Sequence, residues 1–303
     1  MYWKTKARLQ RIFSALPGGD HGNYFLQRHV THSIPKNDDD FRFRVRLARE
    51  ILDLVRKHAT GTVGDLTFFE FGAGADLIGP LAFYAMGVNR QLLIDRSTLL
   101  RRSLVSDTLE KFARIGPRLG FSRLPVGRDH RPSRDRRDAL RDEFGIDYRA
   151  PVDARATGLP ERSVDVVTSN STLEHVPQDE LPALLNECRR ILRPGGLLAM
   201  RVDYEDHYAY SDVRVSPYNF LYYSEAEWKR YNPALHFQNR LRHSDYGERF
   251  RAAGLDILEE HRLDAGPETL AQLDATRLDA RFRGYDLADL TVRKCTFLMR
   301  RGA

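Results

Sequence analysis

The chain of 303 residues has only two cysteines, Cys188 and Cys295, which lie far apart. This excludes a disulfide-rich scaffold and provides no paired thiolates for a zinc site, so a reducing compartment is expected. Long apolar stretches are also lacking. The longest, residues 68–86, is interrupted by Glu70 and Asp76 and would be a poor membrane span. No apolar segment follows the basic residues at the N-terminus, so we expect a cytoplasmic protein without a secretory signal.

The composition that is present is that of a folded globular protein. Hydrophobic residues make up 42% and charged residues 30% of the chain, and no repeat or low-complexity tract occurs. These values exclude a disordered chain, a collagen and a coiled coil. The net charge of +6 is spread over the whole length. It indicates an anionic ligand or surface, and we expect no nucleic-acid partner.

Short apolar runs alternate with stretches of helical periodicity, which predicts an α/β fold. Strands are expected at residues 66–71, 91–95, 146–154, 164–170, 196–204, 255–261 and 290–299. Helices are expected at residues 41–58, 76–86, 97–115, 181–192, 244–253 and 267–278. This alternation favours a mostly parallel sheet with helices on both faces.

Further segments flank this alternating region. Residues 1–59 are expected to form a helical extension that covers the core, and residues 60–303 the main domain with an aromatic-rich insert at about 204–243. Residues 1–16 have the pattern of a basic amphipathic helix. Such a helix could pack on the body of the protein or make peripheral contact with an anionic membrane surface.

A glycine-containing turn follows the first predicted strand. Residues 69–76 read Phe-Glu-Phe-Gly-Ala-Gly-Ala-Asp, and Gly72 and Gly74 allow a sharp turn in which a ligand can approach the backbone around Ala73. Open α/β sheets bind ligands at this end of their strands. The following helix N-terminus would favour a carboxylate or phosphate.

Two classes of cofactor compete for this turn. A dinucleotide loop would have glycine where this chain has Leu77. The acid Glu70 instead suits a ligand with a cationic group, such as S-adenosylmethionine, which carries an ammonium, a carboxylate and a sulfonium. Asp95 ends the second strand, 23 positions after Gly72, near the spacing of about 20 for a ribose-binding acid. Asp95 could alternatively cap a helix.

Later motifs repeat this placement of polar groups after strands. Asp153 follows the third strand and could accept a hydrogen bond from an adenine amine, while the amide of Ala154 donates to a ring nitrogen. The fourth strand ends at Asn170 and is followed by Leu-Glu-His-Val-Pro at residues 173–177. Each of these motifs alone would be an ordinary loop.

In their order, these motifs resemble class I S-adenosylmethionine-dependent methyltransferases, most closely the group with a Leu-Glu-His-Val segment. The resemblance covers about residues 60–204, with Asp76 where many members have a third glycine. It implies a Rossmann-like, doubly wound sheet of seven mostly parallel strands with the last strand antiparallel. It also implies an enzyme that binds S-adenosylmethionine through Glu70, Gly72, Ala73, Gly74, Asp95, Asp153, Ala154 and Asn170.

The segments that flank this core are similar to bacterial methyltransferases found with polysaccharide-biosynthesis enzymes. They comprise residues 23–28, 203–207, 217–224 and 238–246. This similarity implies O-methylation of a sugar or glycan precursor. Methylation of a small amine or natural product remains an alternative, as does a non-catalytic fold that binds cofactor or a partner. The sequence does not predict an oligomeric state.

A hydroxyl acceptor needs a base, and two histidines are candidates, of which His175 is the leading one. His175 follows the fourth strand, and His207 lies just past the fifth with Asp203, which could orient it. Asp203, Asp206 and His207 could instead hold a divalent ion, but the base is the preferred interpretation and no metal site is predicted. Glu174 could orient His175 or face solvent.

The region after the fifth strand offers groups for an acceptor. Tyrosines and a tryptophan crowd residues 204–231 and could stack on sugar faces or pack the insert onto the core. Arg240 and Arg242 could hold an anionic group or lie on the surface.

Overall fold

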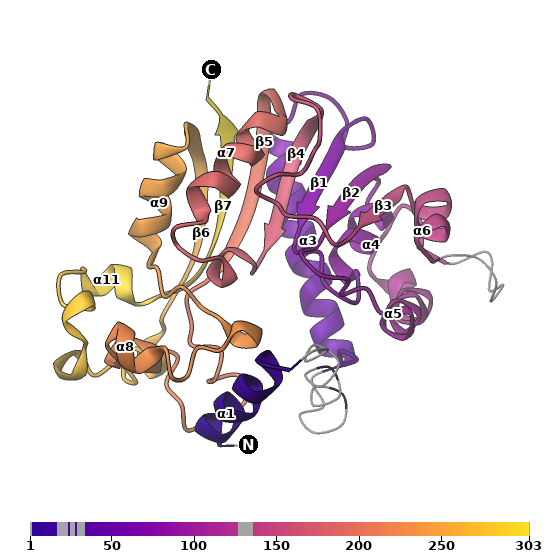
Figure 1. Cartoon of the computed structure of the whole chain (residues 1–303). Helices are drawn as coiled ribbons and strands as arrows, with labels where there is room; N and C mark the ends of the chain where they lie inside the picture. Colours follow the sequence, from indigo (N-terminus) through magenta and orange to yellow (C-terminus); the bar gives the residue numbers. More distant parts are fainter. Residues whose placement is uncertain (1, 17–23, 25–27, 29–33, 127–135, 303) are drawn as a thin grey trace.

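The computed structural model describes residues 2–16, 24, 28, 34–126 and 136–302. Seven strands form one sheet in the order β3-β2-β1-β4-β5-β7-β6 (Figure 1). All pairs are parallel except those of β7, which runs antiparallel to both β5 and β6. The predicted Rossmann-like fold is therefore confirmed.

The strands are β1 (Thr67–Phe71), β2 (Arg90–Ile94), β3 (Ile146–Arg149), β4 (Val164–Asn170), β5 (Leu192–Asp203), β6 (Leu255–Asp264) and β7 (Val292–Arg301). The α-helices are α1 (Trp3–Ser14), α3 (Asp38–His58), α4 (Ile78–Ala85), α5 (Arg102–Ile115), α6 (Arg136–Phe144), α7 (Leu181–Ile191), α8 (Glu225–Trp228), α9 (His243–Ala252), α10 (Pro267–Leu270) and α11 (Leu287–Leu290).

Helices cover both faces of the sheet because its strands are apolar on both. In β1, Phe68 joins the core on one face, whereas Phe69 and Phe71 join the core on the other. The first core includes α3, α4 and α5, and the second includes α7 and α9. Figure 1 shows α7 and α9 in front of the sheet and α3 behind it. Burial on both faces is typical of parallel strands.

Local signals define the ends of α3. Asn37 accepts a hydrogen bond from the amide of Asp40 at 2.8 Å, as an N-cap residue does. Acidic residues occupy the first turn and basic residues the last, which complements the helix dipole. The helix packs on α4 and so supports the turn that follows β1.

The aromatic-rich insert packs with itself, with α1 and with residues 278–290. The ring of Trp3 lies 5.2 Å from that of Tyr208 and 4.8 Å from that of Tyr231. The amide of Trp3 donates to Asp212 at 3.1 Å. The buried residues of α1 therefore pack on the insert.

Two arginines hold this insert from inside. Arg242 is fully buried and donates to the carbonyls of Tyr204, Leu290 and Val292 at 2.8–3.1 Å. Arg240 is 2% exposed and donates to two backbone carbonyls and a carboxylate. Both side chains therefore stabilise the insert from inside the protein. They do not lie on the surface, and their guanidinium groups are already bound to protein oxygens.

One predicted helix is wrong. Of residues 267–278, only the turn Pro267–Leu270 is α-helical. The side chain of Asp274 accepts from the amide of Thr276 at 3.1 Å and starts a separate short turn. Such a side-chain bond competes with helix continuation. Among the described residues, no helix is long and apolar enough to cross a membrane.

Candidate active site

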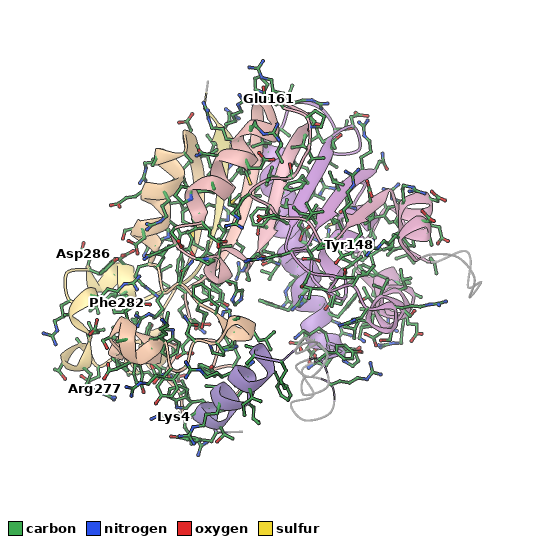
Figure 2. All side chains as sticks on the ribbon, viewed as in Figure 1. Lys4, Tyr148, Glu161, Arg277, Phe282 and Asp286 are labelled. Atoms are coloured by element: carbon green, nitrogen blue, oxygen red, sulfur yellow. The ribbon has the colours of Figure 1, made fainter. Side chains whose placement is uncertain are left out.

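Asp95 lies at the carboxyl end of β2 against the glycine-containing turn. It is 2% exposed. Its Oδ1 accepts from the amide of Gly74 at 3.4 Å, and its Oδ2 accepts from the hydroxyl of Tyr148 at 2.9 Å. Figure 2 labels Tyr148 beside the ends of the parallel strands. Tyr148 was not predicted, because its partner is 53 residues away in sequence.

Glu70 forms a second buried carboxylate next to Asp95. Its described hydrogen-bond donor is the hydroxyl of Thr168, at 3.4 Å. Burial, and then the charge of Asp95, raise the pKa of Glu70 to about 7. Burial also raises the pKa of Asp95 to about 6. Neither carboxylate has an ion pair within the described part of the chain, so the pair fits a ligand that carries a cation and hydroxyl groups.

The two glycines of the turn serve different purposes. Both have positive φ, +75° at Gly72 and +78° at Gly74. A Cβ at Gly72 would lie 2.3 Å from the hydroxyl oxygen of Thr172, so that glycine permits close packing of two loops. A Cβ at Gly74 would meet no atom within 4 Å. Space therefore remains beside Gly74 for a ligand, and the amides of Ala73 and Gly74 face Asp95.

The other predicted cofactor residues lie nearby. The amide of Val152 donates to the carbonyl of Asp95 at 2.9 Å, which brings Asp153 and Ala154 to the same sheet edge. Asp153 forms an ion pair with Arg155 at 2.6 Å, which holds the pKa of Asp153 at about 2. An adenine amine would therefore share the carboxylate with this arginine, which the sequence did not identify.

Asn170 ends β4 and remains half-buried. Its side-chain oxygen accepts from the hydroxyl of Ser171 at 3.3 Å. Asn170 pairs in the sheet with Arg201, two residues before β5 ends. The loops after β4 and β5 consequently leave the sheet side by side.

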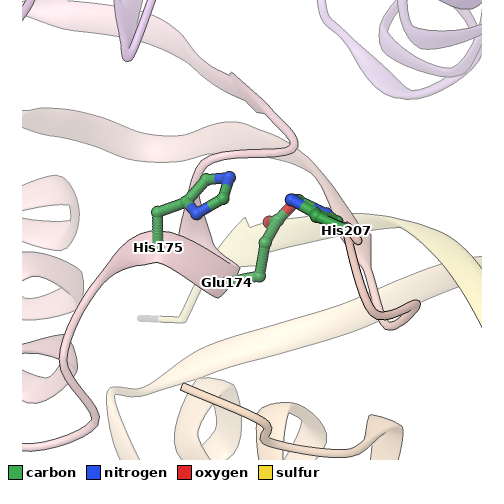
Figure 3. Close-up of side chains that lie close together, drawn as sticks. All are labelled: Glu174, His175 and His207. Atoms are coloured by element: carbon green, nitrogen blue, oxygen red, sulfur yellow. The ribbon is translucent and has the colours of Figure 1, made fainter. Parts of the chain in front are cut away.

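These two loops bring both predicted histidines together. The rings of His175 and His207 lie 5.0 Å apart (Figure 3). The Nδ1 of His175 donates to the carbonyl of Phe237 at 2.6 Å, because a carbonyl oxygen only accepts. That bond leaves the Nε2 lone pair of the neutral ring free. Burial lowers the pKa of both histidines, most strongly for His207, although part of the His175 side chain reaches the surface.

Asp203 is near His207 but is bonded elsewhere. Its Oδ2 lies 3.8 Å from the Nε2 of His207, which is too long for a hydrogen bond. The same oxygen accepts from the hydroxyl of Tyr210 at 2.6 Å and pairs with Lys294 at 3.2 Å. Asp203 therefore lies near His207 without the orienting hydrogen bond that the expected Asp–His pair would have.

Glu174 faces inward beside the histidines. It is 3% exposed, and neither of its carboxylate oxygens has a hydrogen-bond partner within the described residues. Glu174, His175 and His207 each place one potential ligand atom within 4.8 Å of the others (Figure 3). Asp206, expected nearby, instead accepts from Asn219 at 2.7 Å and from the amide of Tyr208 at 2.8 Å.

A family model for the methyltransferase domain matches residues 133–200. A search of curated proteins found no match. The fold is similar to a geranyl diphosphate methyltransferase in complex with S-adenosylmethionine, at 14% identity over 90% of this chain and 94% of that one, with a TM-score of 0.48. A Galdieria sulphuraria protein, provisionally assigned as a sarcosine dimethylglycine methyltransferase, is 13% identical over 85% and 86% of the chains, with a TM-score of 0.47.

Another similar structure is the [4+2]-cyclase SpnF, at 16% identity over 86% of this chain and 81% of that one, with a TM-score of 0.46. The matched domain, the strand order and the carboxylate pair agree with the expectations of enzyme class and cofactor, which are confirmed. Residues 133–200 match a methyltransferase domain, and this match supports S-adenosylmethionine as the cofactor.

Proposed function

We propose that the protein transfers a methyl group from S-adenosylmethionine to a hydroxyl of a sugar or glycan precursor. The observation that carries the proposal is the pair of histidines where the loops after β4 and β5 meet, with rings 5.0 Å apart. Hydroxyls are poor nucleophiles, and a neutral imidazole within reach can take their proton.

The donor would be held by the groups at the ends of β1 and β2. Glu70 suits its ammonium, and Asp95 suits the ribose hydroxyls through the acceptor capacity left beside Tyr148. Asp153, Ala154 and Asn170 would line the same edge. When bound, the donor supplies a methyl carbon that an acceptor oxygen attacks, while the electron pair of the broken C–S bond stays on sulfur.

The histidines are suited to accept the proton that the acceptor oxygen loses. Their lowered pKa values keep both rings neutral near pH 7, so each retains a lone pair. Asp203 and its partner Tyr210 complete this side of the site. The ring of Tyr210 lies 5.3 Å from that of His207, and Tyr210 is 56% exposed, so it can stack on a sugar face.

A screen of acceptors with labelled methyl donor tests this function. Sugars and glycan precursors should accept label, and His175→Gln or His207→Gln should lower turnover by about 10²–10⁴-fold with donor affinity unchanged. The exposed His261 of the edge strand β6 provides the matched control, since its ring contacts Glu259 and neither site histidine.

If only amines accept the label, the acceptor is an amine and the proposed hydroxyl acceptor is wrong. Donor binding without transfer to any acceptor would favour a non-catalytic role. A place in polysaccharide biosynthesis and a cytoplasmic location remain predictions from the resemblance. Peripheral membrane contact does too, and it is supported by the exposed Arg8 and Arg11 of α1.

A further inference from the structure

Glu174 is a buried carboxylate without a cation. Its neighbours Asp203 and Glu205 are matched by Lys294, at 3.2 and 3.4 Å, and Glu205 also pairs with Arg293. Within the part of the chain that the structure describes, Glu174 has neither an ion pair nor a hydrogen bond to its side-chain oxygens. Such a group is costly to bury unless it is neutral or meets a cation.

Two histidines lie near this carboxylate, and each has a ring nitrogen that can bind a cation. His207 has a buried Nε2 that lacks a hydrogen-bond partner among the described residues. His175 donates from Nδ1 to the carbonyl of Phe237, which presents Nε2 as a free lone pair. A histidine that binds a metal usually anchors its other nitrogen on a carbonyl or carboxylate in this way.

We infer that Glu174, His175 and His207 form a binding site for one divalent transition-metal ion, such as Zn²⁺. Two imidazoles and one carboxylate are a known three-residue ligand set for catalytic zinc and for other first-row ions, whereas Mg²⁺ and Ca²⁺ prefer oxygen alone. The three ligand atoms lie within 4.8 Å of one another. Bonds of about 2.0–2.2 Å require a closer set, so the ion would draw the side chains together.

The surroundings suit such an ion. Glu174 is buried and lies near the negative charge of Asp203, so the two carboxylates repel each other. A divalent cation would offset both effects and keep the carboxylate ionised. The partly exposed ring of His175 provides an approach from solvent. Three protein ligands also leave a coordination position open.

This inference rests on the proposed function for the position and class of the acceptor, and it replaces the histidine base of that proposal by a bound metal ion. With a metal in place, the histidine lone pairs serve as ligands and no longer take the acceptor proton. The ion would orient the hydroxyl and favour loss of its proton, which would pass to solvent at the exposed side of His175. The chemistry of the acceptor would be unchanged.

Titration of the chelator-treated full chain with Zn²⁺ and Co²⁺ tests the site. We expect one ion per chain, and Co²⁺ spectra of nitrogen and oxygen ligation without thiolate bands. Glu174→Gln has nearly the same shape and should weaken binding by at least about 100-fold, the upper cost of losing even an outer-shell partner. If that variant fails to fold, His175→Gln, with its more exposed ring, replaces it.

His236 provides the control, because its ring lies 6.2 Å from that of His207 and contributes no atom to the set. His236→Gln should bind the ion like the unmodified chain. No stoichiometric binding, unchanged affinity in Glu174→Gln, or lost affinity in His236→Gln would overturn the site. The titration does not measure transfer, so its failure leaves hydroxyl methylation in place, and a failed acceptor screen leaves the metal result in place.

Discussion

Replacing Asp95 with asparagine should stabilise the protein and lower its affinity for S-adenosylmethionine. Asp95 is 2% exposed and lies beside the second buried carboxylate, Glu70. Its pKa is raised from 3.8 to about 6. The folded state therefore holds a proton that the unfolded state releases between these values, and stability falls as the pH rises through this window.

The size of the effect follows from the shift. A rise of about two pKa units corresponds to about 3 kcal/mol of destabilisation above pH 6, at about 1.4 kcal/mol per unit. In Asp95→Asn the side-chain oxygen can still accept from Tyr148, but the new NH₂ group faces the amide of Gly74. That mismatch costs about 1 kcal/mol. We expect a net gain of about 1–2 kcal/mol at pH 7.5, which shrinks toward pH 5.

Donor affinity should move in the opposite direction. Each charged hydrogen bond to a ribose hydroxyl is worth about 1.5–3 kcal/mol, so loss of one weakens binding by about 10–150-fold. Urea unfolding at pH 7.5 and 5 measures stability, and calorimetry measures affinity. Asp53→Asn removes the same charge from the exposed side of α3, where Asp53 pairs with Arg56, and should change neither by much.

Two outcomes would refute this reasoning. An Asp95→Asn variant less stable than the parent at pH 7.5 would mean that the buried carboxylate is stabilising. A folded variant with unchanged donor affinity would remove Asp95 from the cofactor site.

Three further predictions concern single positions. Donor affinity should rise as the pH increases through about 7, because Glu70 must lose its proton to bind an ammonium, and calorimetry on Glu70→Gln should show no such rise. Arg242→Met should lower the free energy of unfolding in urea by about 3 kcal/mol or more, because three backbone carbonyls lose their donor. Gly145→Ala should cost about 2–5 kcal/mol, since its Cβ would lie 1.9 Å from the Asn89 carbonyl oxygen, whereas Gly195→Ala, with similar φ and open space, should cost about 1–2 kcal/mol.

The sequence pattern predicted strand positions, because these depend on residues close together in the chain. The strand at residues 164–170 has the predicted bounds, because a β-branched run there is flanked by turn residues. The end of β2 at Ile94 likewise puts Asp95 at the sheet edge. These positions follow from the alternation of strands and helices, which the chain shows without any knowledge of tertiary contacts.

The remaining features depend on partners distant in sequence. From the sequence alone, Arg242 could be a surface residue. Its burial depends on the carbonyls of residues 290 and 292, which accept its hydrogen bonds. Glu174 could equally well have faced solvent, and its burial depends on neighbours distant in sequence such as His207 and Asn239. Asp203 pairs with Lys294, which lies on the distant strand β7, and makes no hydrogen bond to His207. Side-chain surroundings of this kind are set by packing and cannot be read from spacing.

The position of β7 between β5 and β6 also constrains the order in which the sheet is assembled. During synthesis β6 emerges first, yet it is joined to the sheet only through β7. Until residues 292–301 are available, the nascent chain carries a strand without a neighbour and leaves the edge of β5 open. Unpaired edges of this kind are prone to mispairing and aggregation. A ribosome that stalled before Val292 would thus release a protein lacking two strands of its sheet.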